Sequence, residues 1–188
     1  MKFGFFALVA SNVANAYWGN VERMYPIRSE KSYRLDDSEI NFISEKPIRL
    51  DEEYFKTLRI GFNGYIGGTN NSKNYRILPI FMMNYDLVTG DGIVQYTEKF
   101  SQHYKKEVID DISDMFQVQL DQPEVLVVSW QSMSPKRHES CYEKEDTHNS
   151  FEAVLVWEND VTFLLIQFQL IQAPLDCITQ KYGLVSWR

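Results

Sequence analysis

The sequence is poor in cysteine and histidine and has no excess of positive charge. Its 188 residues include two Cys and three His, which is too little cysteine for a small fold built on several disulfides. Nineteen Lys and Arg against 26 Asp and Glu give a formal net charge of -7. That sign is wrong for a surface that binds a phosphate backbone by displacing cations, so we predict no nucleic acid partner.

Long hydrophobic runs are also missing. A membrane span needs roughly 18 to 20 unbroken apolar residues. The nearest candidate is 161–171, and Gln167 and Gln169 interrupt it at strand spacing. The carboxyl end has no lipid-anchor signal of small residues, polar spacer and hydrophobic tail. We therefore predict no membrane span in this chain and expect a released product.

The remaining composition is that of one folded domain with much β-structure. A length of 188 residues suits a single domain with short appendages. Hydrophobic residues make up 44% and charged residues 24%, which argues against wholesale disorder. Aromatic residues reach 14%, and they favour pleated, half-buried surfaces.

The amino end has the three parts of a secretory signal peptide. Lys2 supplies a positive charge, residues 3–10 form a short apolar run, and Ala14-Asn15-Ala16 forms a small-x-small triplet. We predict cleavage after Ala16 and hence a secreted, extracellular protein. An N-terminal core strand or helix is the alternative.

The rest of the chain divides into three parts. Residues 17–46 are expected to be a polar lead-in with one strand, residues 47–172 the main domain, and residues 173–188 a C-terminal extension. Residues 182–188 have the pattern of a strand that ends at the last residue. This leaves two readings open, a truncated product of a longer protein and a genuine short secreted protein.

The first strands of the main domain are marked by alternation and turns. Leu58, Ile60 and Phe62 alternate with other residues ahead of Asn63-Gly64, a pair typical of hairpin turns. The apolar run 76–83 contains Pro79, which predicts an edge strand or a bulge, because proline cannot donate to a ladder. Residues 93–96 form a further strand after a tight turn.

Three more strands are predicted after Pro123, over 125–130, 151–157 and 161–170. In the last of these, one apolar face should lie in the core and the face of Gln167 and Gln169 should be at least partly wet. A long polar loop, 132–148, separates the first two strands, and loops of that length are typically functional or mobile.

A helical period appears once. The predicted apolar positions are Tyr104, Val108, Ile112, Met115 and Phe116, with charged residues between them, and Thr97 or Ser101 is expected to cap the start. The predicted fold class is α+β, mostly β, with antiparallel sheets and one principal amphipathic helix.

Two covalent modifications are predicted. Asn70-Asn71-Ser72 is an N-glycosylation acceptor triplet in a Gly/Asn-rich turn. In a secreted chain, Cys141 and Cys177 are expected to form one disulfide, which would join the long loop to the segment after the last strand.

Catalytic and metal-binding patterns are weak. His138, Cys141 and His148 lack the paired spacing of a structural zinc site, and Asp86 and Asp91 lack the alternating acidic positions of a calcium loop. Neighbouring carboxylates (Asp36-Asp37, Glu52-Glu53 and Asp110-Asp111) point to different faces of a strand or helix. No Gly-x-Ser-x-Gly elbow is present. We predict a non-catalytic chain with no cofactor and no metal.

Five blocks in a fixed order resemble the NIDO domain, the extracellular module of nidogen, alpha-tectorin and some membrane mucins. The first is the strand and Asn-Gly turn of 54–66. The others are the Pro-containing strand 77–81 followed by Asp86, the strand 92–96 ahead of the helix, the strand 125–130 ending in tryptophan, and the hairpin of 149–155 and 159–163. Together they cover about 48–172.

The resemblance implies a secreted binding module acting in cell-matrix adhesion or matrix assembly, with matrix or cell-surface proteins as partners. It brings no catalytic residues. Two alternatives remain open. One is a secreted enzyme fragment, which a cleft joining His138 or His148 to a nucleophile would support. The other is a small-ligand carrier with an aromatic-lined cavity.

Overall fold

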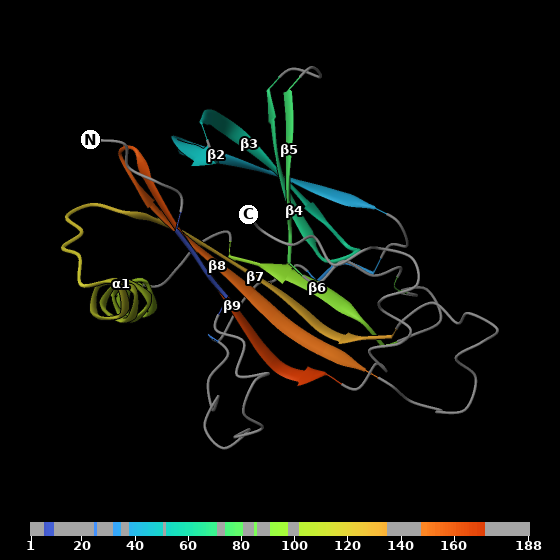
Figure 1. The fold of residues 1–188 in the computed structure, drawn as a ribbon. Coiled ribbons are helices and arrows are strands. Elements are labelled where there is room, and N and C mark those ends of the chain that lie inside the picture. The colour runs from blue at the N-terminus through green and yellow to red at the C-terminus, as the bar shows by residue number, and fades with distance from the viewer. Residues whose placement is uncertain are drawn as a thin grey trace.

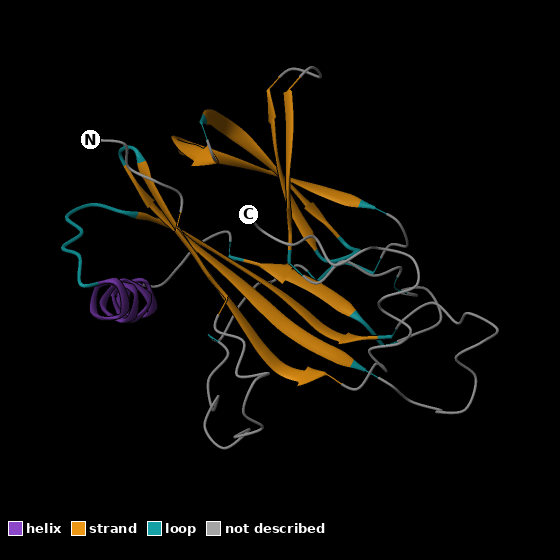
Figure 2. Cartoon of the chain, in the orientation of Figure 1, coloured by secondary structure: helices purple, strands orange, loops and turns teal. Residues whose placement is uncertain are grey.

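The computed structural model describes residues 6–9, 25, 32–34, 38–50, 52–70, 74–80, 85, 91–97, 102–134 and 148–171. This part of the chain is mostly β with a single helix, as predicted (Figures 1 and 2). The elements in chain order are β1 Phe6–Val9, β2 Glu39–Leu50, β3 Glu53–Gly61, β4 Tyr65–Asn70, β5 Asn74–Pro79, β6 Ile93–Tyr96, α1 Gln102–Phe116, β7 Glu124–Met133, β8 Asn149–Glu158 and β9 Val161–Ile171.

The first sheet has four strands in the order β2-β3-β4-β5, and all its pairs are antiparallel. The hairpin predicted around Asn63-Gly64 is confirmed as β3 and β4. Gly64 has φ 80° in the turn, a conformation that glycine adopts without steric cost. Pro79 is the last residue of β5, which lies at the edge of the sheet as predicted.

The second sheet has five strands in the order β1-β9-β8-β7-β6. Strands β6 to β9 pair antiparallel, whereas β1 runs parallel to β9. The antiparallel sheets are as predicted, with the exception of β1, which comes from the far end of the chain and joins β9 without a hairpin. Residues 6–9 fall within the predicted signal peptide, whose cleavage stays a prediction.

The two sheets pack face to face around an apolar core. The alternating positions that face the other sheet are fully buried, including Leu58 and Ile60 on β3 and Leu126 and Val128 on β7. Trp130 stacks on Phe151 with 5.0 Å between ring centroids and 13° between planes. This interior is close-packed with large side chains.

Helix α1 covers the opposite face of the five-stranded sheet (Figure 1). Val108 and Ile112 are buried there against a second apolar cluster, and the rings of Phe116 and Phe163 are 5.0 Å apart. The second face of β9 is partly wet at Gln167 and Gln169, as predicted, whereas Phe163 and Leu165 on the same face are buried under the helix layer. Gln169 is exposed.

One position of the helix differs from prediction, and one of the two predicted caps is excluded. Met115 is 44% exposed, whereas Phe116, the next residue, packs on the apolar cluster. Thr97 does not cap the helix. Its Oγ1 accepts from the N–H of Val127 at 3.0 Å and lies 3.5 Å from the carbonyl oxygen of that residue. Ser101 lies outside the described residues.

The predicted lead-in contributes to both sheets. β2 begins at Glu39 and supplies the edge of the four-stranded sheet. Tyr33 forms a bridge with Val94, exchanging backbone hydrogen bonds of 3.0 and 3.1 Å, and its ring stacks on Tyr96. The single strand expected in this segment is thus present, and isolated residues before it are also tied to the fold.

Candidate functional site

The structure leaves most of the predicted site residues untested. Asn70 is the last residue of β4, and its backbone pairs with Asn74 where the hairpin ends. Residues 71 and 72 of the triplet lie outside the described residues. Cys141 and Cys177 also lie outside them, so the glycan and the disulfide both stay predictions.

Of the weak metal candidates, His138, Cys141 and Asp86 are outside the described residues, while Asp91 is exposed. His148 is described, and its Nδ1 lies 3.0 Å from the Oγ of Ser134. This contact joins the end of β7 to the start of β8. Within the described ranges, no three His, Cys, Asp or Glu side chains are grouped to hold a metal ion.

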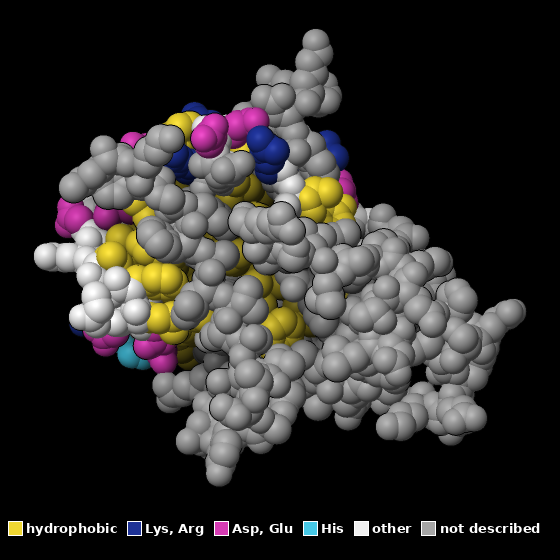
Figure 3. All heavy atoms as spheres, viewed as in Figure 1, with side chains coloured by type: hydrophobic (Ala, Val, Ile, Leu, Met, Phe, Trp, Pro, Cys, Tyr) yellow, Lys and Arg dark blue, Asp and Glu magenta, His cyan; other side chains and the backbone are white. Residues whose placement is uncertain are grey.

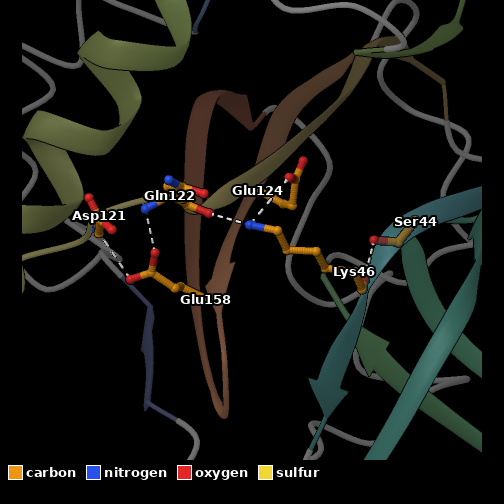
Figure 4. Close-up of polar contacts among 6 residues, drawn as sticks. All are labelled: Ser44, Lys46, Asp121, Gln122, Glu124 and Glu158. Carbon is orange, nitrogen blue, oxygen red and sulfur yellow. Dashed lines mark hydrogen bonds and ion pairs between the residues drawn. The ribbon is translucent and has the colours of Figure 1, made fainter.

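One end of the sandwich carries a polar cluster that joins the two sheets (Figure 4). The pairing of β2 with β3 shifts register between Ile43 and Ile48, and there the Oγ of Ser44 donates to the carbonyl of Lys46 at 2.5 Å. Lys46 Nζ donates to the carbonyl of Gln122 at 2.6 Å and lies 3.8 Å from Glu124 Oε1. The irregular part of β2 is thereby fastened to the chain entering β7.

Glu158, at the end of β8 in the five-stranded sheet, binds the same turn. Its carboxylate oxygens accept the backbone N–H groups of Asp121 at 3.2 Å and Gln122 at 2.5 Å. Hydrogen bonds to an ionised acceptor are about twice as strong as neutral ones. The turn before β7 is therefore held from both sheets, by Lys46 and by Glu158.

The turn between β8 and β9 makes a second link to the first sheet. Tyr54 donates its hydroxyl to Asp160 Oδ1 at 2.5 Å, and Arg49 Nη1 donates to the carbonyl of Asp160 at 3.2 Å. The Arg49 guanidinium lies 6.0 Å from the centre of the Tyr54 ring. The hydrogen bond to Asp160 raises the pKa of Tyr54.

The outer face of the four-stranded sheet points away from the core. The alternation that buries Leu58 and Ile60 turns Arg59 outward, and Arg59 Nη1 lies 3.2 Å from Glu39 Oε2. Tyr65 donates its hydroxyl to the other Glu39 oxygen. Figure 3 shows acidic and basic side chains interspersed over this sheet.

Two large apolar side chains are exposed on that face. Ile43 is 76% exposed on β2, and Ile77 is 43% exposed on β5. We name as the outer face the residues Glu39, Ile43, Arg59, Tyr65 and Ile77. Both side chains are accessible to a partner, and they stand on opposite edge strands of the sheet.

A buried acid lies on the helix side of the other sheet. Glu152 in β8 is fully buried, and its Oε1 accepts the backbone N–H of Tyr25 at 3.2 Å. Burial raises the pKa of Glu152 to about 8, although the hydrogen bond from Tyr25 acts in the opposite direction. Tyr25 in turn donates its hydroxyl to Asp111 Oδ2 at 2.5 Å.

Burial, followed by the hydrogen bond to Asp111, holds the pKa of Tyr25 well above its ordinary value. Sequence reasoning missed both Tyr25 and Glu152. The available signal was a lone acidic residue within the apolar strand 151–157, since acidic residues are almost never fully buried without a partner.

The geometry is that of two β-sheets with a helix on one outer side, and a family comparison agrees with the resemblance. The model of the nidogen-like domain, NIDO, matches residues 37–181. The chain belongs to this family. The match covers most of the chain and includes β2 to β9, the outer face and Glu152, whereas Tyr25 precedes it. NIDO domains are extracellular, non-catalytic modules.

No curated protein and no solved structure matches this NIDO domain chain. Among the described residues, no helix has the length and apolar character needed to cross a membrane. The family match over residues 37–181 is therefore the main guide to function.

Proposed function

We propose that this NIDO domain chain is a secreted, non-catalytic binding module that takes part in cell-matrix adhesion or in assembly of the extracellular matrix. The observation that carries the proposal is the family match over residues 37–181. The signal-peptide pattern of residues 1–16 and the acceptor triplet at Asn70 support secretion.

The outer face is the part of the domain where we expect matrix or cell-surface proteins to bind. Ile43 and Ile77 offer apolar area at opposite edges of the sheet, and the pair Arg59 and Glu39 supplies charge between them. Protein interfaces combine apolar contacts with charged and hydrogen-bonded pairs, and this face offers both.

Aspartate substitutions at the two isoleucines test the assignment. Ile43→Asp and Ile77→Asp, alone and combined, should weaken retention of the purified secreted protein on cell-free matrix by about tenfold or more for the pair, because each places a charge in the contact. Met115→Asp is the matched control, since Met115 is similarly exposed but lies on α1. Equal binding by all these variants would place the contact elsewhere.

The contact between Ser134 and His148 gives the enzyme alternative one specific observation. A hydroxyl within hydrogen-bond reach of an imidazole is the first element of an activated nucleophile. A fluorophosphonate probe tests for such a nucleophile, with Ser134→Ala as control. Under the binding-module proposal the probe should label neither protein, whereas labelling that disappears in the variant would favour the enzyme.

The carrier alternative is the less supported of the two. Fully buried aromatic side chains occupy the space between the sheets, namely Trp130, Phe151, Phe55, Phe62 and Tyr85. They pack against one another, and Phe151 contacts both Trp130 and Tyr85. These ring contacts between the sheets support a role exercised on the outer surface.

A further inference from the structure

Glu152 is an acid buried at a position where its strand neighbours offer no charge. Its register partners are Ser129 on β7 and Gln167 on β9. Its side chain is fully buried, Oε1 accepts the N–H of Tyr25, and Oε2 has no hydrogen-bond partner in the described part of the chain. An ionised carboxylate is costly in such surroundings, and a protonated one costs much less.

The groups that face Tyr25 from the helix are also acidic. Asp111 accepts the Tyr25 hydroxyl, and both Asp111 and Glu107 act on the phenol as negative charges. β7 and β9 contribute Ser129 and Gln167, and the surrounding cluster is apolar, with Val108, Ile112, Val127 and Val154. Ionisation of Glu152 would add another negative charge to this group.

Tyr25 contacts Glu152 directly and is buried beside it. It is buried in the same cluster, yet it precedes the NIDO match and lies 127 residues from Glu152 along the chain. We propose that Tyr25 and Glu152 form a pH-sensitive latch, in which Tyr25 stays docked on the NIDO domain while Glu152 is protonated and undocks when Glu152 ionises.

The linkage follows from hydration of the carboxyl group. With Tyr25 docked, burial holds the pKa of Glu152 at about 8 even though the hydrogen bond from the Tyr25 N–H favours the charged form. The latch requires that undocking admits water to the carboxyl group, which moves its pKa toward the ordinary value near 4.5. Between these values each undocking event releases one proton. The undocking equilibrium therefore shifts toward the open form by up to about tenfold per pH unit, the limit reached when the carboxyl group becomes fully hydrated.

Undocking would also uncover part of the apolar cluster around Val127 and Val154. If the protein is secreted as proposed, the latch would be closed in acidic compartments and open increasingly in neutral or alkaline surroundings. That compartment depends on the proposed function. The latch does not, because it concerns only contacts within the chain.

Hydrogen exchange on the full chain tests the latch. Overlapping peptides isolate the exchange of the Tyr25 amide, which is corrected for its intrinsic rate at each pH. If the latch recloses faster than the open amide exchanges, protection at Tyr25 should fall by up to about 100-fold between pH 5 and pH 7. Glu152→Gln keeps the shape and the acceptor but cannot ionise, so its protection should be independent of pH. Peptides from β7 and β8 should stay protected in both proteins.

Two further variants keep the test decisive. Asp111→Asn should change the level of protection at Tyr25 but preserve its pH slope, because the ionising group remains. Tyr25→Ala removes the cover without altering Glu152, and the carboxyl resonance of Glu152 should then titrate nearer its ordinary range. A flat profile in the unaltered protein, an unchanged slope in Glu152→Gln, or parallel loss of protection in β7 and β8 would overturn the latch.

Discussion

The indole nitrogen of Trp130 donates a hydrogen bond to the carbonyl oxygen of Gly61, 3.1 Å away in the opposite sheet. The same carbonyl accepts the N–H of Gly64 at 3.1 Å. Trp130 is fully buried on β7, and Gly61 ends β3 next to the hairpin turn. This polar contact within an apolar core fixes how the first hairpin sits on the second sheet.

Trp130→Phe should therefore lower the free energy of unfolding by about 1 to 3 kcal/mol, from the lost hydrogen bond and the smaller ring. Urea denaturation followed by circular dichroism measures the change. A loss below about 0.5 kcal/mol, the range of ordinary surface substitutions, would mean that the bond contributes little.

Two glycines that look alike in sequence should respond differently to alanine. A Cβ on Gly68 would lie 2.5 Å from Cγ of Phe55, which is fully buried and has no room to move. A Cβ on Gly61 would meet the Tyr65 ring at 2.1 Å, but that ring is partly exposed.

We expect Gly68→Ala to cost about 1 to 3 kcal/mol or more, as overpacking does, and Gly61→Ala to cost less because Tyr65 can turn outward. Combining Gly68→Ala with Phe55→Leu should recover part of the loss. The reverse order of the two alanine variants in thermal unfolding would contradict this account of the packing.

At the polar end of the sandwich, the hydrogen bonds of Glu158 should stabilise the fold more than the contacts of Lys46 do. Glu158→Ala should destabilise the fold by about 0.5 to 2 kcal/mol, as the loss of a helix cap does, because two backbone N–H groups lose an ionised acceptor at a solvent-exposed turn. Lys46→Met should cost at most about 1 kcal/mol, since its ion pair with Glu124 is exposed to solvent. Chemical denaturation of both variants compares the links, and equal losses would show that the solvent-exposed bonds of Lys46 matter more than expected.

The buried acid gives the whole fold a pH dependence of predictable sign. The pKa of Glu152 is raised from 4.5 to about 8 in the folded protein, so the unfolded chain releases this proton first as pH rises. The contribution of Glu152 to stability is complete below about pH 4.5 and declines by roughly 1.4 kcal/mol per pH unit toward pH 8. The decline should level off earlier where Tyr25 undocks.

Glu152→Gln should remove this contribution and make the protein more stable than the unaltered one at pH 8. Melting temperatures between pH 5 and pH 9 measure the effect, and Asp110→Asn on the exposed side of α1 serves as control. If Glu152→Gln and the unaltered protein show the same dependence on pH, the folded protein does not retain this proton.

Secretion should leave three covalent marks that one mass-spectrometric experiment can read. Protein collected from culture medium should begin at Tyr17, carry a glycan at Asn70 that Asn70→Gln abolishes, and contain a bond between Cys141 and Cys177. Both cysteines should resist iodoacetamide until a reductant is added. Retention of residues 1–16 or labelling of both thiols would count against the proposed compartment.

The strands and turns were predictable because their signals are local. Alternation around Leu58 and Ile60, the Asn63-Gly64 turn and the proline at the end of β5 each follow from neighbouring residues. The docking of Tyr25 was not predictable, because its partners Asp111 and Glu152 are 86 and 127 residues away. The burial of Phe163 and Leu165 on the second face of β9 was not predictable for the same reason, since their cover is α1.

The candidate binding surface was likewise beyond local reasoning. Ile43 and Ile77 come from opposite edges of one sheet, and only the pairing of four strands puts them on one face. A single apolar residue in a strand pattern does not reveal whether it faces a core or solvent. The family resemblance was found because it depends on the order of the strand and turn motifs.

Binding of the secreted protein to cell-free extracellular matrix tests the central claim most directly. Labelled protein should be retained in a saturable manner, and excess unlabelled protein should displace it. The Ile43→Asp, Ile77→Asp pair should displace it poorly, while Met115→Asp should compete as well as the unaltered protein. Absence of saturable retention on every matrix and cell surface tested would contradict the account.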